Sequence, residues 1–190
     1  GGYMSTTIVC CNTRKYHGLM VAPIDQSDRT YVLLSSLDET LIQHDQAFNL
    51  ALHRYDGVYE PRGHKYITDF EYTPTPTITY RVGGAILRKE LLWIHKRTQL
   101  MIRYTLVDAH SETTLRLRPL LAFRDKHALS KANMDADGRA YPIPYGVKCR
   151  LYDGFPWLNM QLDKEEAEFV AAPDWYYNFE YRKELARGYD

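Results

Sequence analysis

Residues 85–107 read AILRKELLWIHKRTQLMIRYTLV, and this stretch decides the fold class. Two runs rich in apolar side chains, residues 85–95 and 99–107, flank a short polar link. Within the second run apolar and polar side chains alternate, as they do in a strand with one buried face. The stretch therefore predicts two antiparallel strands joined as a hairpin. On the second strand, the side chains expected to share one face are Leu100, Ile102, Tyr104 and Leu106.

Runs of the same kind recur on both sides of this hairpin, about 8–12 residues apart and separated by turn residues. Gly83 and Gly84 are expected to form a tight turn, because glycine accepts a positive φ. Residues 126–138 are expected to form a long loop, and residues 175–190 a helix. The other expected strands are residues 7–11, 19–22, 30–36, 40–44, 47–55, 68–73, 77–82, 114–123, 147–151 and 157–162.

The strand pattern predicts an all-β chain that forms a two-sheet antiparallel sandwich around one hydrophobic core. A chain of 190 residues is long enough for one such core and short for two. We expect a single β-sandwich domain over residues 1–190. The core side chains expected to be buried are Leu33, Leu50, Leu52, Ile86, Ile102, Leu106, Leu115 and Leu117.

The composition argues against two classes of partner. The formal net charge is +0, from 24 basic and 24 acidic residues, whereas a nucleic-acid-binding face normally leaves a basic excess. The chain has no apolar run of about 18 residues, the minimum for a membrane-spanning helix. We therefore expect neither nucleic acid nor a membrane as a partner.

Cysteine usage suggests a reducing compartment. The chain has three cysteines, Cys10, Cys11 and Cys149, an odd number without the spacing of a disulfide framework. A zinc site would need paired ligands such as Cys-x-x-Cys, and no such pair occurs. The chain begins at Gly1 rather than Met, so its amino terminus does not reveal a targeting segment. We expect a cytoplasmic protein without a metal or another cofactor.

No catalytic pair stands out among the 24 acidic residues. Acid–base catalysis by carboxyl groups needs an acid and a base or nucleophile placed on the two sides of the reacting bond. Asp38 and Glu39 are adjacent, and adjacent strand residues face opposite sides of a sheet. Asp125 lies between Arg124 and Lys126, which suits an ion pair. We therefore assign no catalytic role to any residue of this chain.

A polar segment at residues 12–19 reads NTRKYHGL and lies between two apolar runs. It places a guanidinium, an ammonium, a phenol and an imidazole in four successive residues, from Arg14 to His17. Such groups hydrogen-bond hydroxyls, and the rings stack on flat apolar faces such as that of a sugar. Taken alone, the segment is more simply interpreted as a solvated connection.

Three further segments accompany it: LLSSLDET at residues 33–40, RYDGVYEPRGHKY at 54–66 and LRPLLAFRDKH at 117–127. Together and in this order, the four segments resemble the N-terminal domain of the bacterial and archaeal type of glycogen debranching enzyme. The resemblance runs from Gly1 to residues 123–127, and more loosely to the end. One departure is residues 5–11, where smaller side chains are expected in the family.

The resemblance implies a large antiparallel supersandwich, of the kind found in galactose mutarotase-like and glucoamylase-type N-terminal domains. It also implies that the chain is the N-terminal part of a longer enzyme. In that enzyme an (α/α)6 barrel, absent from these residues, hydrolyses the α-1,6-linked glucose left at a glycogen branch point. The implied partners are this C-terminal catalytic domain and a glycogen-like α-glucan. The residues expected to contact one or the other are Arg14, Tyr16, His17, Arg54, Tyr55, Arg62, His64, Arg124, Asp125 and His127.

Three alternatives stay open. In the first, the sandwich is a stand-alone carbohydrate-binding module. In the second, it is a mutarotase-like epimerase with a histidine acid and a glutamate base, drawn from His17, His64 or His127 and Glu39 or Glu60. In the third, the arginines only fix loops by pairing Arg14 with Asp38, Arg62 with Glu60 and Arg124 with Asp125.

Overall fold

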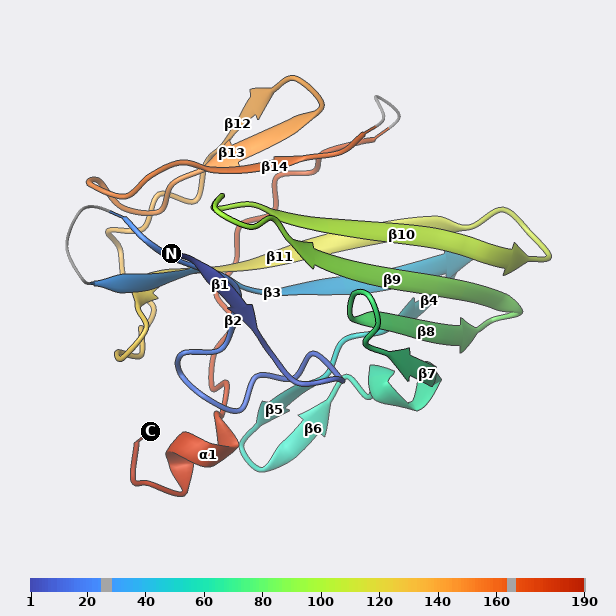
Figure 1. Cartoon of the computed structure of the whole chain (residues 1–190), viewed down its shortest axis with the longest axis horizontal. Coiled ribbons are helices and arrows are strands. Elements are labelled where there is room, and N and C mark those ends of the chain that lie inside the picture. The colour runs from blue at the N-terminus through green and yellow to red at the C-terminus, as the bar shows by residue number, and fades with distance from the viewer. Residues whose placement is uncertain (25–28, 164–166, 190) are drawn as a thin grey trace.

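The computed structural model describes residues 1–24, 29–163 and 167–189 and is an all-β antiparallel sandwich (Figure 1). One large sheet has the order β1 (Tyr3–Ser5), β2 (Gly18–Pro23), β3 (Thr30–Gln43) and β11 (Thr114–Asp125), and β4 (Gln46–Asn49) also pairs with β3. The other large sheet has the order β10 (Leu100–Ala109), β9 (Ala85–Trp93), β8 (Thr77–Val82) and β7 (Ile67–Glu71).

Smaller elements cover the ends of the sandwich. A three-stranded sheet contains β12 (Ala140–Ile143), β13 (Gly146–Cys149) and β14 (Leu158–Gln161). A hairpin joins β5 (His53–Tyr55) to β6 (Val58–Glu60), and a 3-10 helix follows at Gly63–Tyr66. The short helix α1 (Arg182–Leu185) lies beside this hairpin (Figure 1).

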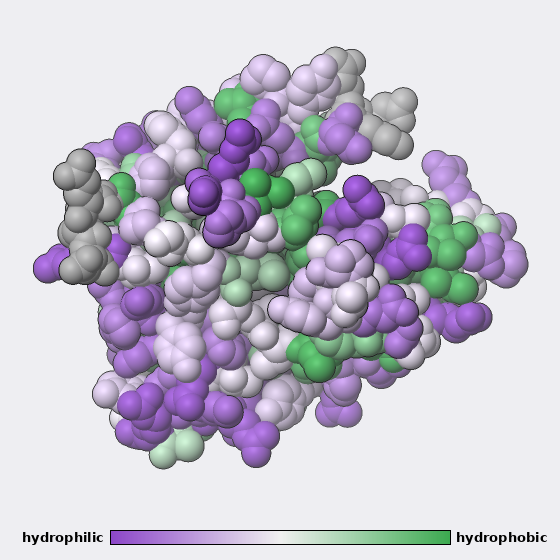
Figure 2. Space-filling model, viewed as in Figure 1, coloured by the Kyte–Doolittle hydropathy of each residue, from purple (hydrophilic) through white to green (hydrophobic). Residues whose placement is uncertain are grey.

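The hairpin expected over residues 85–107 is confirmed as β9 and β10. Their pairing shifts between Leu106 and Asp108, where an extra residue forms a bulge that interrupts the alternation of faces. The prediction that Leu106 is buried is wrong, because Leu106 lies at this bulge and is 45% exposed. Figure 2 shows apolar surface at the end of β10. Of the other expected core residues, Leu33, Leu50 and Leu52 are buried, and Ile86, Ile102, Leu115 and Leu117 are half-buried.

Three predicted strands differ in the first 44 residues of the chain. Residues 7–11 form a turn rather than a strand, since the Cys10 N–H donates to the Thr7 carbonyl at 2.8 Å and Cys10 has a φ of 54°. The strands expected over residues 30–36 and 40–44 are one strand, β3. β11 pairs with β3 across residues 37–39, so the ladder continues without a break.

Two further predicted elements are divided or shortened. The strand expected over residues 47–55 divides into β4 and β5, because the Asn49 side chain accepts the Ala51 N–H at 2.9 Å and turns the chain. Of the helix expected over residues 175–190, only α1 is helical, and Asp190 lies outside the described residues. The turn at Gly83 and Gly84 is confirmed, with φ of 59° and 79°. The remaining expected strands correspond to β2, β7, β8, β11, β13 and β14.

The core consists of two clusters of buried apolar side chains. The first lies between the two large sheets, and the second attaches the three-stranded sheet to the sandwich. The first contains Leu41, Leu50, Ile78, Tyr80, Val82 and Leu87, and the second contains Leu19, Leu33, Leu34, Phe123 and Leu158.

A buried ion pair crosses the interior between the two large sheets. Lys89 Nζ of β9 lies 2.5 Å from Glu39 Oε1 of β3, and both side chains are almost wholly buried. The Tyr104 hydroxyl of β10 donates to the same oxygen at 2.6 Å. Burial disfavours the charged amine and by itself would lower the pKa of Lys89. The attraction of the Glu39 carboxylate is larger than this effect, so the pKa of Lys89 is raised well above its ordinary value. Asp38 faces the other way, as expected from its place next to Glu39, and contacts His53.

Replacing Lys89 by methionine should lower the free energy of unfolding by about 3–5 kcal/mol, because Glu39 becomes a buried charge without its partner. Urea unfolding followed by circular dichroism measures this change. The matched control is Arg88→Met, since Arg88 is the exposed neighbour on the same strand, and its effect should be within about 0.5 kcal/mol. An unchanged unfolding midpoint for Lys89→Met would show that the ion pair does not join the sheets.

Candidate functional site

Most candidate residues gather at one end of the molecule, around the C-terminal segment that contains α1 (Figure 1). They come from the loop before β2, from β5 and from the end of β11. Figure 2 shows hydrophilic side chains over α1 and the β5–β6 hairpin. We call this group the C-terminal seat, and it contains Arg14, His17, Arg54, Arg124, Glu180, Tyr181 and Glu184.

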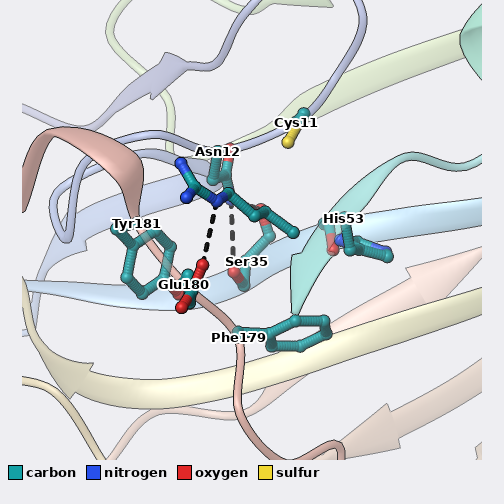
Figure 3. A pocket seen from close by; sticks show the side chains of 9 residues that line it. Cys11, Asn12, Ser35, His53, Phe179, Glu180 and Tyr181 are labelled. Carbon is teal, nitrogen blue, oxygen red and sulfur yellow. Dashed lines mark hydrogen bonds and ion pairs between the residues drawn. The ribbon is translucent and has the colours of Figure 1, made fainter. Parts of the chain in front are cut away.

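β5 holds the C-terminal segment through both backbone and side-chain contacts, and Figure 3 shows the side-chain contact to Glu180. Arg54 Nε lies 2.9 Å from Glu180 Oε2, and the Arg54 carbonyl accepts the Glu180 N–H at 2.8 Å. The same carboxylate oxygen accepts the Gly57 N–H at 2.8 Å. The Arg54 and Glu180 side chains are 19% and 21% exposed, so water screens this pair less than it screens a surface pair.

Glu184 is the most deeply buried charged group of the seat. Its side chain is 1% exposed, and its carboxylate oxygens lie 3.7 Å from Arg14 Nη1 and 3.5 Å from Arg187 Nη1. Neither oxygen accepts a hydrogen bond from a described residue. The charge of Glu184 is therefore compensated by two arginines rather than by direct hydrogen bonds. The Thr13 carbonyl accepts the Lys183 N–H at 3.1 Å, which ties α1 to the loop that carries Arg14.

His17 is an uncharged acceptor within the same loop. Its Nδ1 accepts the Thr13 N–H at 3.2 Å. Burial lowers the pKa of His17, and the positive charges of Arg14 and Lys183 lower it further against the opposing effect of Glu184. The partly exposed Tyr16 ring meets His17 edge-on, with 5.5 Å between the ring centroids.

Arg124 fixes both the turn after β11 and the C-terminal segment. Its Nη1 donates to the Ala128 carbonyl at 2.8 Å and to the Asp125 carbonyl at 3.3 Å. Its Nη2 lies 3.5 Å from the Tyr181 hydroxyl, and the guanidinium lies 5.8 Å from the centroid of that ring. The Asp125 carboxylate accepts the His127 N–H at 2.8 Å, so it shapes the turn, and His127 itself is exposed.

A buried aspartate–histidine pair lies next to the seat. His53 Nε2 lies 2.8 Å and 2.9 Å from the two carboxylate oxygens of Asp38. The His53 ring packs against the ring of Phe179, 4.8 Å between centroids, and against Tyr55 at 6.1 Å. Burial, followed by the charge of Asp38, raises the pKa of Tyr55 to about 12, so its phenol stays neutral. The pair thus anchors β5 to β3 among aromatic rings.

A small polar cavity lies between the C-terminal segment and β5 (Figure 3). Its volume is about 20 Å³, which is room for a single water molecule. A glucose unit does not fit, so the seat is packed by the protein's own chain. The cavity is lined by Cys11, Asn12, Ser35, Ser36, His53, Arg54, Phe179, Glu180 and Tyr181.

The loop after β6 and the 3-10 helix lie apart from the seat, on the far side of the β5–β6 hairpin (Figure 1), and these segments contain Arg62 and His64. Both are exposed, and Arg62 Nε lies 3.5 Å from Glu60 Oε1. This is the one ion pair of the loop-fixing alternative that is present among the described residues. Arg14 pairs with Glu184 instead of Asp38, and Arg124 bonds to carbonyl groups.

Sequence reasoning missed the acidic half of the seat. Glu180 and Glu184 are four residues apart, which would place them on one face of the helix expected over residues 175–190. In the structure Glu180 lies before α1, and its partner Arg54, like Arg14 that meets Glu184, lies far away in the sequence. In the part of the chain that the structure describes, no three His, Cys, Asp or Glu side chains come together as metal ligands. No described helix is both long and apolar enough to cross a membrane.

Comparison with known proteins identifies one family. The family model described as glycogen debranching enzyme N terminal matches residues 1–190, which is the whole chain. No curated protein and no solved structure gives a significant match. The resemblance based on the four sequence segments is therefore confirmed, and it extends to the segment that contains α1.

Replacing Arg14 by alanine should loosen α1, because Glu184 loses one of its two compensating charges. Removing a partner of a buried charged group costs about 1–3 kcal/mol, so the amides of residues 183–188 should exchange with solvent about tenfold faster. Hydrogen exchange read by mass spectrometry measures this effect. Arg182→Ala is the control, since Arg182 is exposed on α1 itself and should leave exchange unchanged. Equal exchange in both variants would contradict the role given to Arg14.

The seat should weaken in acid because of His17. The folded protein holds the pKa of His17 below 6.5, so the unfolded chain binds the proton more readily. Stability from this group is therefore fully present above pH 6.5 and is lost as the pH falls below it. The drop in urea unfolding midpoint between pH values of about 7.5 and 5.5 should be smaller in His17→Gln than in the wild type. His95→Gln, at an exposed turn, should keep the wild-type drop.

Proposed function

The chain belongs to the family of glycogen debranching enzyme N-terminal domains, and on that basis we propose that it is a non-catalytic domain that supports the catalytic part of such an enzyme. The parent enzyme would hydrolyse α-1,6-glucosidic branch points in glycogen-like α-glucans. The single β-sandwich of residues 1–190 would position an (α/α)6 barrel that these residues do not contain.

The C-terminal seat is the observation that carries this proposal. Arginines from the loop before β2 and from β5 and β11 hold the segment of residues 179–189 by charged contacts, including a buried carboxylate on α1. A segment held at several points keeps one direction relative to the sandwich. In the parent enzyme this would fix the path of the chain toward the catalytic domain, and a small displacement at a catalytic site has a large effect on rate.

The adjacent carboxylates Asp38 and Glu39 favour a non-catalytic role. Asp38 is bound by His53, and Glu39 is bound by Lys89 and Tyr104, so neither carboxylate faces a cavity that could hold a sugar. A glycosidase needs two carboxyl groups on either side of a substrate bond, roughly 5–10 Å apart. These two groups face opposite sides of β3 and cannot share one substrate.

The candidate contact residues divide into two groups under this proposal. The buried and half-buried ones would hold the C-terminal segment in place or, in the case of Asp125, shape the turn after β11. The exposed ones would contact loops of the catalytic barrel or outlying glucose units. The first group contains Arg14, His17, Arg54, Tyr55, Arg124 and Asp125, and the second contains Tyr16, Arg62, His64 and His127.

The mutarotase-like alternative has less support from the geometry. A mutarotase-like reaction would need a histidine and a glutamate facing one sugar. Among the described residues, no hydrogen bond or ion pair joins His17, His64 or His127 to Glu39 or Glu60. Three free cysteines, Cys10, Cys11 and Cys149, favour a cytoplasmic location.

Incubation of the isolated chain with a branched limit dextrin should release no glucose above the buffer rate, because the catalytic pair would lie in the barrel. In the parent enzyme, His17→Ala should lower kcat/KM by about 1–3 kcal/mol of transition-state stabilisation, through displacement of the C-terminal segment. His95→Ala is the matched control at an exposed turn and should leave kcat/KM unchanged. Turnover by the isolated chain, or equal activity of the two variants, would refute the supporting role.

A further inference from the structure

We propose that a groove between the end of β4 and the loop after β6 binds a short stretch of α-glucan, outside the C-terminal seat. The choice of an α-glucan as the ligand rests on the proposed function. The groove is open to solvent on one side and has a volume of about 540 Å³, within the range of about 300–1,000 Å³ typical of small-molecule sites. It is lined by Asn49, Glu60, Pro61, Arg62, Lys65 and Tyr66.

The walls of the groove are fixed by packing beneath them. The Gly63 N–H donates to the Ala51 carbonyl at 2.9 Å, and a Cβ at Gly63 would collide with the Leu50 backbone. Glycine therefore allows the 3-10 helix to press against the chain that follows β4. The Tyr66 ring meets Phe48 edge-on, 6.3 Å between centroids, at the border of the first core cluster. A groove ordered in advance loses less entropy when a ligand binds.

Polar groups on both walls are available to a ligand. Asn49 Oδ1 accepts the Ala51 N–H, and no described residue accepts a hydrogen bond from the Asn49 amide nitrogen. Arg62 uses only Nε within the protein, toward the Tyr59 carbonyl at 3.4 Å and Glu60 at 3.5 Å. The Arg62 and Glu60 side chains are 63% and 59% exposed, so solvent already reaches both groups.

This set of groups suits a neutral polyhydroxylated ligand. A sugar hydroxyl both donates and accepts, so it can accept from Arg62, Lys65 or the Asn49 amide and donate to the Glu60 carboxylate. Lys65 Nζ lies over the Tyr66 ring, 4.9 Å from its centroid, and this cation–π contact holds the ammonium donor at the wall of the groove. A fully ionised phosphate has no proton to donate to the Glu60 carboxylate and would leave that acceptor unused, whereas a sugar hydroxyl can donate to it.

Titration of the 190-residue chain with maltoheptaose, followed by ¹⁵N NMR, tests the proposal. Chemical-shift changes should be confined to the residues around the groove, and Arg62→Ala should weaken binding about tenfold, the usual cost of one lost charged hydrogen bond. Arg103→Ala is the matched control, because Arg103 is an exposed arginine that pairs with Glu90 at 3.9 Å on the β9–β10 hairpin. Circular dichroism checks that each variant is folded. If the Arg62→Ala variant does not fold, Lys65→Ala takes its place and should weaken binding in the same way.

Absence of maltoheptaose binding, equal binding by the Arg62 and Arg103 variants, or binding of inorganic phosphate in place of the sugar would each overturn the groove proposal. These outcomes are distinct from a failure of the proposed function. The supporting role is tested by the activity of the His17→Ala variant of the parent enzyme. The result of that test does not depend on whether the groove binds sugar.

Discussion

The ion pair between Lys89 and Glu39 is the interaction on which the two-sheet arrangement depends. Each charge alone would be unfavourable in the interior, so β3 and β9 must face one another in one register for the charges to meet. Tyr104 of β10 donates to the same carboxylate and extends the constraint to a third strand. Apolar packing would allow several registers of comparable energy, whereas a buried charge with one partner favours a single register.

The opposite face of β3 organises the C-terminal seat. Asp38 points away from the core and binds His53, which places β5 beside β3. β5 then pairs with the C-terminal segment through Tyr55 and Phe179 and through the Arg54–Glu180 contacts. Two adjacent carboxylates on one strand therefore have separate tasks, one inside the sandwich and one toward the seat.

The seat and the groove lie on two sides of the β5–β6 hairpin and follow different physical rules. In the seat, charges are buried and find partners within the chain, which suits the fixing of a segment. In the groove, Arg62 and Glu60 stay largely exposed and keep hydrogen-bonding groups free for a ligand. The strong internal contacts of the seat and the solvent access of the groove are both consistent with a domain that supports an enzyme acting on a polymer.

The sequence by itself determined the all-β class, the hairpin of residues 85–107, the opposite facing of Asp38 and Glu39, and the family. These features depend on the local alternation of apolar and polar side chains and on the order of four short sequence segments. Tertiary contacts rarely change what such local patterns specify. Only the tertiary structure decided the continuous β3, the bulge that exposes Leu106, and the partners of each buried charge. The pairing of Arg14 with Glu184 joins opposite ends of the chain. Such a contact depends on how the whole chain packs, and local sequence patterns carry no information about it.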